Sequence, residues 1–347
     1  MLNVDPKQCT GCRACEQICP RHCIRMQPDK NGFLYPVICG EACINCHMCE
    51  KACPINKDDC YESRASDVYA AYLKDEDTLK DSASGGMFPA LAAMMLERGG
   101  VIYGCAWSDE MNAMHIRVTD KKDLIRLQGS KYVQSNTENT FSTVKQDLSN
   151  GKYVLYTGTP CQIAGLKLFL GKEYDRLVTV DLICHGVPSD KILKDYIKWV
   201  EEKKKAKVQK ISFRSSWGEE MILSDGRKDI WHRRMWWDPY LEAFNSGMIN
   251  NDACFECPFA GKKRCSDLTI GDFWGIGAEA PYHKPDRKVS VIGVNSERGY
   301  RFLQEATSLI LEKRNWSEAV SGNSQLRSPL KKSSQYNLFW ETYCKYG

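Results

Sequence analysis

Residues 9–20 read CTGCRACEQICP and residues 43–54 read CINCHMCEKACP. Both stretches follow the pattern C-x2-C-x2-C-x3-C-P, so the chain contains an internal duplication. Three thiolates this close together on a tight loop can occupy three corners of one metal centre, whereas the fourth ligand must come from elsewhere. Pro20 and Pro54 end the short helical turn that we expect in each stretch. The duplication therefore predicts two metal centres near the amino terminus.

The duplicated pattern resembles the bacterial two-cluster ferredoxins, in which three cysteines of each run bind one cubane and the fourth binds the other. The resemblance implies a small ferredoxin-like domain with two 4Fe-4S clusters over residues 1–62. Carried over residue by residue, it assigns one cluster to Cys9, Cys12, Cys15 and Cys53, and the second cluster to Cys43, Cys46, Cys49 and Cys19. Two zinc knuckles are the alternative, but these would not need the duplicated C-x3-C-P. Outside the pattern we expect spare thiols at Cys23, Cys39 and Cys60.

Composition limits the class of protein. Hydrophobic residues make up 43% and charged residues 27% of the 347 residues, which excludes a disordered, collagen-like or coiled-coil protein. The net charge of +4 is small and dispersed, so no nucleic-acid partner is expected. No secretory leader opens the chain, and no apolar run approaches the roughly 18 residues that span a bilayer. We expect a cytoplasmic protein, in which a dense cysteine cluster binds metal rather than forming disulfides.

The remainder of the chain predicts an α/β or α+β core, with a mixed sheet and flanking helices. We place a domain boundary in the polar stretch 62–67 and divide the core into residues 68–160 and 161–347. Strands are predicted over 101–107, 153–156, 177–184, 210–214, 268–273 and 290–295. Helices are predicted over 82–100, 137–149, 160–170, 189–205 and 297–312. Neither the Rossmann dinucleotide motif nor a P-loop occurs, so this is not a standard Rossmann fold.

Four of the later cysteines have the surroundings of metal ligands. Cys161 and Cys184 each follow a predicted strand, at the end that adjoins crevices in α/β sheets. Cys254 and Cys257 form a C-x2-C pair, a spacing that lets two thiolates reach one centre. Zinc and iron-sulfur are equally compatible with this spacing.

Six motifs in order along the core carry a second resemblance. They are SGGMF at 84–88, GSKY at 129–132, TGTPCQIAGL at 157–166, DLICHGVPS at 181–189, CFECP at 254–258 and DLTIGDFWG at 267–275. Together they resemble the coenzyme F-420 hydrogenase/dehydrogenase beta-subunit family over about residues 70–315. The resemblance implies a flavin-dependent oxidoreductase that binds FAD, with FMN as the alternative. It also implies a third 4Fe-4S cluster held by Cys161, Cys184, Cys254 and Cys257, with Cys265 as an alternative ligand.

The same motifs supply candidate flavin-binding residues. A glycine-rich helix N-terminus offers backbone N–H groups to a pyrophosphate, although a helix cap without a ligand is the alternative. The candidates are Ser84, Gly85 and Gly86 at that helix, Gly129, Ser130 and Lys131 near phosphate, and Thr157, Gly158 and Thr159 near the flavin. Asp272 either binds flavin hydroxyls or caps a turn.

His185 is the candidate catalytic residue, because its ordinary pKa of about 6.5 suits proton transfer to a substrate beside the flavin. A histidine held by backbone in a turn is the alternative. Trp231, Trp236 and Trp237 alternate with basic residues and either line an acceptor pocket or pack in the core.

These features predict that ferredoxin, or another low-potential donor, passes electrons through the clusters to FAD, which reduces a small organic acceptor. In the reversed alternative, reduced deazaflavin coenzyme F-420 is oxidised and electrons leave through the clusters. A third reading is a non-catalytic electron-transfer subunit.

Overall fold

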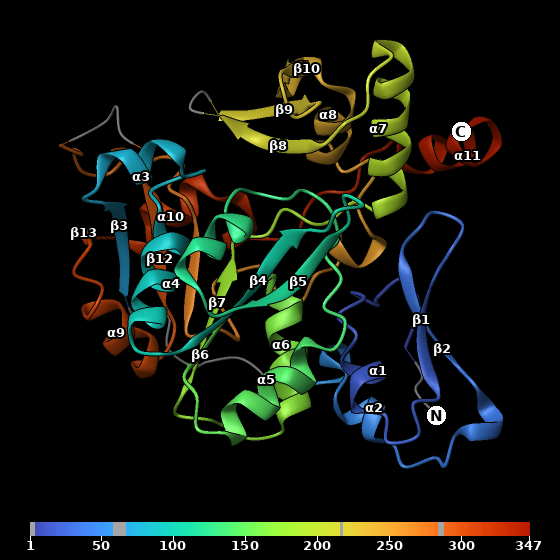
Figure 1. Cartoon of the computed structure of the whole chain (residues 1–347), viewed down its shortest axis with the longest axis horizontal. Coiled ribbons are helices and arrows are strands. Elements are labelled where there is room, and N and C mark those ends of the chain that lie inside the picture. The colour runs from blue at the N-terminus through green and yellow to red at the C-terminus, as the bar shows by residue number, and fades with distance from the viewer. Residues whose placement is uncertain (1–3, 58–66, 216–217, 284–287) are drawn as a thin grey trace.

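The computed structural model describes residues 4–57, 67–215, 218–283 and 288–347 (Figure 1). Cys60 and residues 62–66 of the expected domain boundary lie outside the described residues. The strands of the described part form a two-stranded ribbon, a three-stranded sheet and an eight-stranded sheet. No helix of this part is long and apolar enough to span a membrane.

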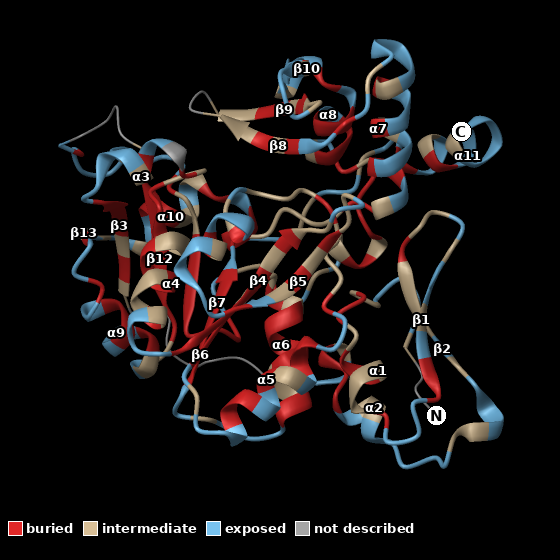
Figure 2. Cartoon of the chain, in the orientation of Figure 1, coloured by how far each residue is buried: buried red, intermediate tan, exposed pale blue. Residues whose placement is uncertain are grey.

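The amino-terminal unit is small and contains little regular structure. Helices α1 (Ala14–Ile18) and α2 (Met48–Lys51) lie within the two cysteine-rich stretches. Strands β1 (Ile24–Pro28) and β2 (Leu34–Ile38) pair antiparallel between them. Much of the ribbon remains partly exposed, so this unit depends on its packing against the core (Figure 2).

The eight-stranded sheet has the order β13-β3-β12-β11-β7-β6-β4-β5. Its strands are β3 (Asp67–Leu73), β4 (Val101–Trp107), β5 (Ala113–Val118), β6 (Val154–Gly158), β7 (Leu177–Leu182), β11 (Leu268–Asp272), β12 (Ser290–Val294) and β13 (Leu309–Arg314). Strands β4, β6, β7 and β11 run parallel, whereas β5, β12 and β13 pair antiparallel with their neighbours. The sheet is therefore mixed, as predicted, and the parts 68–160 and 161–347 both supply strands to it.

Helices cover both faces of this sheet. Alternate residues of a strand point to opposite faces, so neighbouring residues pack against different helices. Ile102 and Leu155 pack with helix α4 (Met87–Glu97) in one hydrophobic cluster. Tyr103 and Tyr156 point to the other face and pack with helices α5 (Thr140–Ser149) and α6 (Pro160–Leu170). The shorter helices α3 (Glu76–Asp81), α9 (Glu297–Gln304) and α10 (Trp316–Gly322) complete this part of the molecule.

A second layer has its own hydrophobic core. Strands β8 (Lys210–Ser215), β9 (Gly218–Ser224) and β10 (Asp229–Arg234) form an antiparallel sheet above the main one (Figure 1). Helices α7 (Asp190–Lys204), α8 (Pro239–Asn245) and α11 (Tyr336–Tyr346) pack around it. The Lys-rich end of α7 lies on the surface.

Two predicted helices have different bounds in the structure. The helix predicted over 297–312 is wrong beyond Gln304, because Leu309–Arg314 forms β13 and pairs with β3 from the other end of the chain. The helix predicted from residue 82 begins at Met87, after Gly86 adopts a left-handed φ of 76°. Ser84 therefore does not cap it; its hydroxyl donates to the Val289 carbonyl at 3.2 Å.

Candidate metal centres and cofactor site

The two amino-terminal loops have the same backbone conformation. Gly11 and its counterpart Asn45 have φ of 66° and 52°, and Arg13 and its counterpart His47 have φ of 65° and 58°. Left-handed conformations are rare for residues other than glycine, and they persist where the surrounding structure demands them. The repeated cysteine motif thus builds the same curved loop twice.

The first loop brings together the four cysteines predicted for one cluster. Cys12, Cys15 and Cys53 are buried, and Cys9 is partly buried. Burial, with the nearby charge of Cys53, raises the pKa of Cys9 to about 11, and burial together with Cys9 and Cys53 raises the pKa of Cys15. Cys53, from the second stretch, therefore lies with the cysteines of the first, as the crossed ligation pattern requires. Thiols with raised pKa values lose their protons when a cation compensates the charge.

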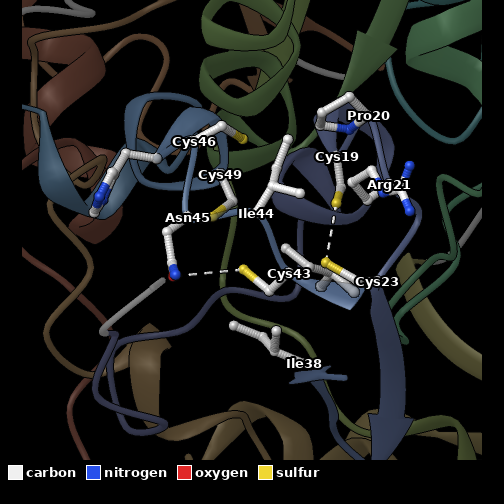
Figure 3. A pocket seen from close by; sticks show the side chains of 12 residues that line it. Cys19, Pro20, Arg21, Cys23, Ile38, Cys43, Ile44, Asn45, Cys46 and Cys49 are labelled. Atoms are coloured by element: carbon white, nitrogen blue, oxygen red, sulfur yellow. Dashed lines mark hydrogen bonds between the residues drawn. The ribbon is translucent and has the colours of Figure 1, made fainter. Parts of the chain in front are cut away.

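The second loop surrounds a small cavity (Figure 3). The four cysteines predicted for the second cluster line it together: Cys19, Cys43, Cys46 and Cys49. Cys23 lines the same cavity, and its Sγ atom lies 3.4 Å from the Sγ atom of Cys19. Cys23 was expected to be a spare thiol, and its position four residues after Cys19 is the signal in the sequence that indicates this place. This site contains five thiols, one more than a cubane needs.

The four core cysteines line one cavity. Cys161 lies in the first turn of α6, Cys184 follows β7, and Cys254 and Cys257 belong to the loop after α8. Burial, and next the charge of Cys161, raises the pKa of Cys184 to about 12. The structure thus gathers the third predicted ligand set from three distant segments. Cys265 is buried in the core and is not among the residues that line this cavity.

The cysteines of the first amino-terminal loop (the first set) adjoin the four core cysteines (the third set). Thr10, from the first loop, lines the core cavity. The charge of Cys161 is among the causes that raise the pKa values of both Cys9 and Cys12. A Cβ atom added at Gly165 of α6 would lie 3.0 Å from the Cys12 Sγ atom, so glycine permits this close approach.

Direct hydrogen bonds fix the amino-terminal unit to the core. The Gln134 side chain donates to the Thr10 carbonyl at 3.1 Å, and the Thr137 hydroxyl donates to the Cys12 carbonyl at 3.1 Å. The Gln17 side chain accepts a hydrogen bond from the backbone N–H of Phe141 at 3.0 Å. The two parts are therefore held in one arrangement rather than joined only by a linker.

The predicted flavin segments meet at one edge of the main sheet. Five strands run in the same direction, as their pairings show, and all end at this edge: β3, β4, β6, β7 and β11. Arg214, which no sequence motif indicated, links three of the segments. It lies 2.9 Å from the Asp272 carboxylate and donates to the Ala83 carbonyl at 3.0 Å and to the Tyr132 hydroxyl at 3.3 Å. Ligands of α/β proteins bind at such an edge.

Several predicted flavin contacts are already used within the protein. The Gly85 N–H donates to the Ser290 hydroxyl at 2.9 Å, and a Cβ atom there would lie 2.2 Å from the Ala71 carbonyl oxygen. The Lys131 ammonium donates to the carbonyls of Gln128 and Gly129. The Thr157 hydroxyl donates to the Tyr103 carbonyl at 3.1 Å. Packing within the sheet is thus sufficient to explain the glycine at position 85.

The remaining predicted flavin residues lie nearby. Thr159 is the N-cap of α6 and its backbone N–H donates to the Gln162 side chain at 3.0 Å. Gly158 ends β6, Gly129 adopts a φ of 76°, and Ser130 follows it in the same loop. The Ser130 side chain makes no hydrogen bond to another described residue.

His185 lies beside this edge. Burial lowers the pKa of its ring, which favours the neutral imidazole; the charges of Glu219 and Asp272 oppose this shift, and that of Arg214 adds to it. Its carbonyl accepts a hydrogen bond from the Asn250 side chain at 3.4 Å. The structure therefore brings His185 and Asp272 into one neighbourhood.

The three tryptophans do not form one group. Trp231 is buried and donates to the Asp238 carboxylate at 3.1 Å, as the core-packing interpretation predicts. Trp236 and Trp237 are 75% and 77% exposed, so core packing is wrong for both. They follow β10, where the second layer reaches the surface.

Comparison with known proteins agrees with the sequence motifs. The model of the coenzyme F420 hydrogenase/dehydrogenase beta-subunit N-terminal region matches residues 68–142, that of the C terminus matches residues 151–317, and that of a 4Fe-4S dicluster domain matches residues 8–57. A chain in a xenon-derivatised structure of the F420-reducing [NiFe] hydrogenase complex from Methanosarcina barkeri has a similar fold, with a TM-score of 0.51 and 17% identity. The similarity covers 80% of this chain and 90% of that one.

No curated protein matches the chain. The family matches confirm the resemblance drawn from the six core motifs and the cysteine duplication. The chain belongs to the coenzyme F420 hydrogenase/dehydrogenase beta-subunit family of oxidoreductases and carries an amino-terminal 4Fe-4S dicluster domain.

Proposed function

We propose that this chain moves electrons between ferredoxin, or another low-potential redox protein, and a small organic acceptor at the carboxyl edge of the main sheet. The amino-terminal cysteines hold two 4Fe-4S clusters, the core cavity holds a third, and FAD lies at the sheet edge. When bound, the clusters supply single-electron transfer and the flavin supplies hydride chemistry.

The core cavity is the observation that carries this proposal. Its wall combines the four core cysteines with Thr10 of the first amino-terminal loop. A cubane takes one thiolate at each of its four iron atoms, and the four cysteines of this cavity supply that number.

The chain's own residues keep the centres close, which matters because electron transfer slows steeply with distance. Gly165 lets α6 approach Cys12, and the hydrogen bonds from Gln134 and Thr137 hold the first loop against the core. Arg214 ties together the segments around the proposed flavin. His185 is the candidate group for exchanging a proton with the acceptor at this edge.

Membership of the F420-linked family supports a reversed direction as the second candidate. Reduced deazaflavin coenzyme F420 would then bind at the sheet edge and be oxidised, and electrons would leave through the clusters that the amino-terminal cysteines would hold. The similar chain comes from an F420-reducing hydrogenase complex, which also supports a role as an electron-transfer subunit with protein partners.

The test starts from protein purified without oxygen. We expect about twelve iron and twelve acid-labile sulfide per chain, from three clusters of ~4 iron each, and FAD in the supernatant after acid treatment. Cys254→Ser should lower the iron content by about four, whereas the exposed Cys344→Ser should not change it. Eight iron in the unaltered chain would contradict the third cluster, and loss of zinc alone in Cys254→Ser would assign the core site to zinc.

Turnover distinguishes the two directions. Oxidation of reduced F420 with a viologen dye as acceptor would favour the reversed reaction, whereas flavin reduction by reduced ferredoxin favours the forward one. Protein with clusters but no flavin and no turnover would be an electron-transfer subunit.

A further inference from the structure

A buried arginine forms part of the wall of the core cavity. Arg264 follows the C-x2-C pair, and its side chain is 2% exposed. One nitrogen, Nη1, donates to the Phe259 carbonyl at 3.2 Å. The Nε and Nη2 atoms have no hydrogen-bond partner in the described part of the chain. Buried donors are almost always hydrogen-bonded, so these two indicate a group that belongs in the cavity.

The ion pair of Arg264 does not account for these donors. Asp181, at the end of β7, is fully buried, and its Oδ2 atom lies 3.9 Å from Nη1 of Arg264. That distance is too long for a hydrogen bond. Neither carboxylate oxygen of Asp181 has a hydrogen-bond partner in the described part of the chain, so the Nε and Nη2 donors of Arg264 are not satisfied by this residue.

The position of Arg264 relative to the cysteines gives the direction of its effect. Arg264 lines the same cavity as Cys184 and Cys257, so its positive charge lies at the wall that holds these thiols. A guanidinium cannot be deprotonated in a protein, so it supplies a permanent charge at this wall.

We propose that Arg264 donates hydrogen bonds to the sulfur atoms of the core 4Fe-4S cluster and, through its charge, makes that cluster easier to reduce. The inference rests on the proposed third cluster and adds a residue that sets its potential. A cluster with four thiolates is an anion that gains a further negative charge on reduction. A buried cation with free donors therefore stabilises the reduced form, and hydrogen bonds and charge are known determinants of cluster potentials.

The second amino-terminal site has no equivalent. Among the described residues that line its cavity the only arginine or lysine is Arg21, which is exposed to solvent. Water and salt screen an exposed charge. Arg264 therefore raises the core potential relative to that of the second amino-terminal site, which favours electron flow into the core.

The experiment uses the full chain and measures the midpoint potential of the core cluster by redox titration with electron paramagnetic resonance detection. Cys254→Ser identifies the core signal as the one it removes. In Arg264→Gln we expect the iron content to be kept and the equilibrium constant for reduction to fall at least tenfold, which is about 59 mV for one electron. Arg264→Lys, which keeps the charge, should restore part of this shift.

Two further variants separate this effect from structural damage. Asp181→Asn removes the negative charge behind Arg264 and should shift the potential in the opposite direction. Arg298→Gln is the matched control, because Arg298 pairs with Asp267 at 2.9 Å and does not line the cavity. It should leave the potential unchanged.

The outcomes are distinct. An unchanged potential in Arg264→Gln with full iron would overturn the inference while leaving the third cluster in place. If Arg264→Gln fails to bind iron, an unchanged potential in Asp181→Asn would overturn it instead. A wild-type chain with only eight iron would remove the third cluster itself, and this inference with it.

Discussion

At the scale of single residues, the extra thiol of the second amino-terminal site has a testable consequence. Cys23 lines the same cavity as Cys19, with 3.4 Å between their sulfur atoms. We expect Cys19→Ser to keep its iron, because Cys23 supplies the fourth thiolate after a small movement. The double variant Cys19→Ser/Cys23→Ser should lose about four iron. Iron analysis checks this, with the exposed Cys39→Ser as control. Loss of a cluster from Cys19→Ser alone would show that Cys23 cannot replace it.

His115 makes stability depend on pH. Burial lowers its pKa to about 4; Nε2 donates to the Thr157 carbonyl at 2.9 Å, and the ring stacks on Tyr156. The unfolded chain, with a pKa of about 6.5, binds the proton more tightly. The contribution of neutral His115 is therefore complete above about pH 6.5 and declines as the pH falls towards 4, by about 3 kcal/mol in total. Thermal unfolding between pH 8 and 4.5 should decline less steeply in His115→Gln. Parallel pH profiles for the two proteins would contradict this.

At the scale of elements, the contact between α6 and the first loop depends on Gly165. A side chain there would meet the Cys12 sulfur at 3.0 Å and the Ala14 Cβ atom at 3.4 Å. We expect Gly165→Val to lower the free energy of unfolding by about 1–3 kcal/mol through overpacking and to slow electron transfer into the core. Gly40→Ala is the control, because an added Cβ there meets nothing within 4 Å. Wild-type stability and electron-transfer rate in Gly165→Val would contradict the close packing.

The sequence predicted those elements whose signals are local. Strand β4 and helix α6 have apolar runs with clear glycine and proline boundaries, and the structure contains both. Strand β13 was mistaken for the end of a helix, because only its pairing with β3, far away in sequence, makes it a strand. The Gly85 N–H was expected to be free for a phosphate, but the Ser290 hydroxyl that accepts its hydrogen bond comes from distant β12. Local patterns do not contain such long-range partners.

The same distinction applies to the candidate sites. The two amino-terminal ligand sets lie in short repeats, and the resemblance of these repeats to two-cluster ferredoxins predicted the sets. The core set comes from three segments that the fold must bring together, and spacing left zinc and iron-sulfur open. Arg214 and Arg264 carry no motif, because their roles depend on the carbonyls, carboxylates and thiols that surround them in space.

At the scale of the whole molecule, the three cysteine sets form an ordered series from the surface to the core. The second set includes the exposed Cys46, the first set is largely buried, and the third adjoins the first through Thr10. Charge effects link neighbouring sets, since Cys49 acts on Cys15 and Cys161 acts on Cys12. This order suggests that a redox protein exchanges electrons at the second site.

Removing the amino-terminal unit would be a poor test of this route, because Cys12, Ala14 and Ala52 belong to the same hydrophobic cluster as residues of α5 and α6. Replacing ligands of the second amino-terminal site in the full chain is a better test of this route. We expect the double variant Cys43→Ser/Cys46→Ser to lose about four iron and to slow reduction by ferredoxin at least tenfold. Reaction with a small dye that reaches the sheet edge directly should continue at the wild-type rate, because the core site is intact. Stopped-flow absorbance measures both reactions, with Cys39→Ser as the control, since Cys39 is exposed and does not line the outer cavity. If reduced ferredoxin still reduces the double variant at the wild-type rate, electrons enter at the first or third site and bypass the second amino-terminal site.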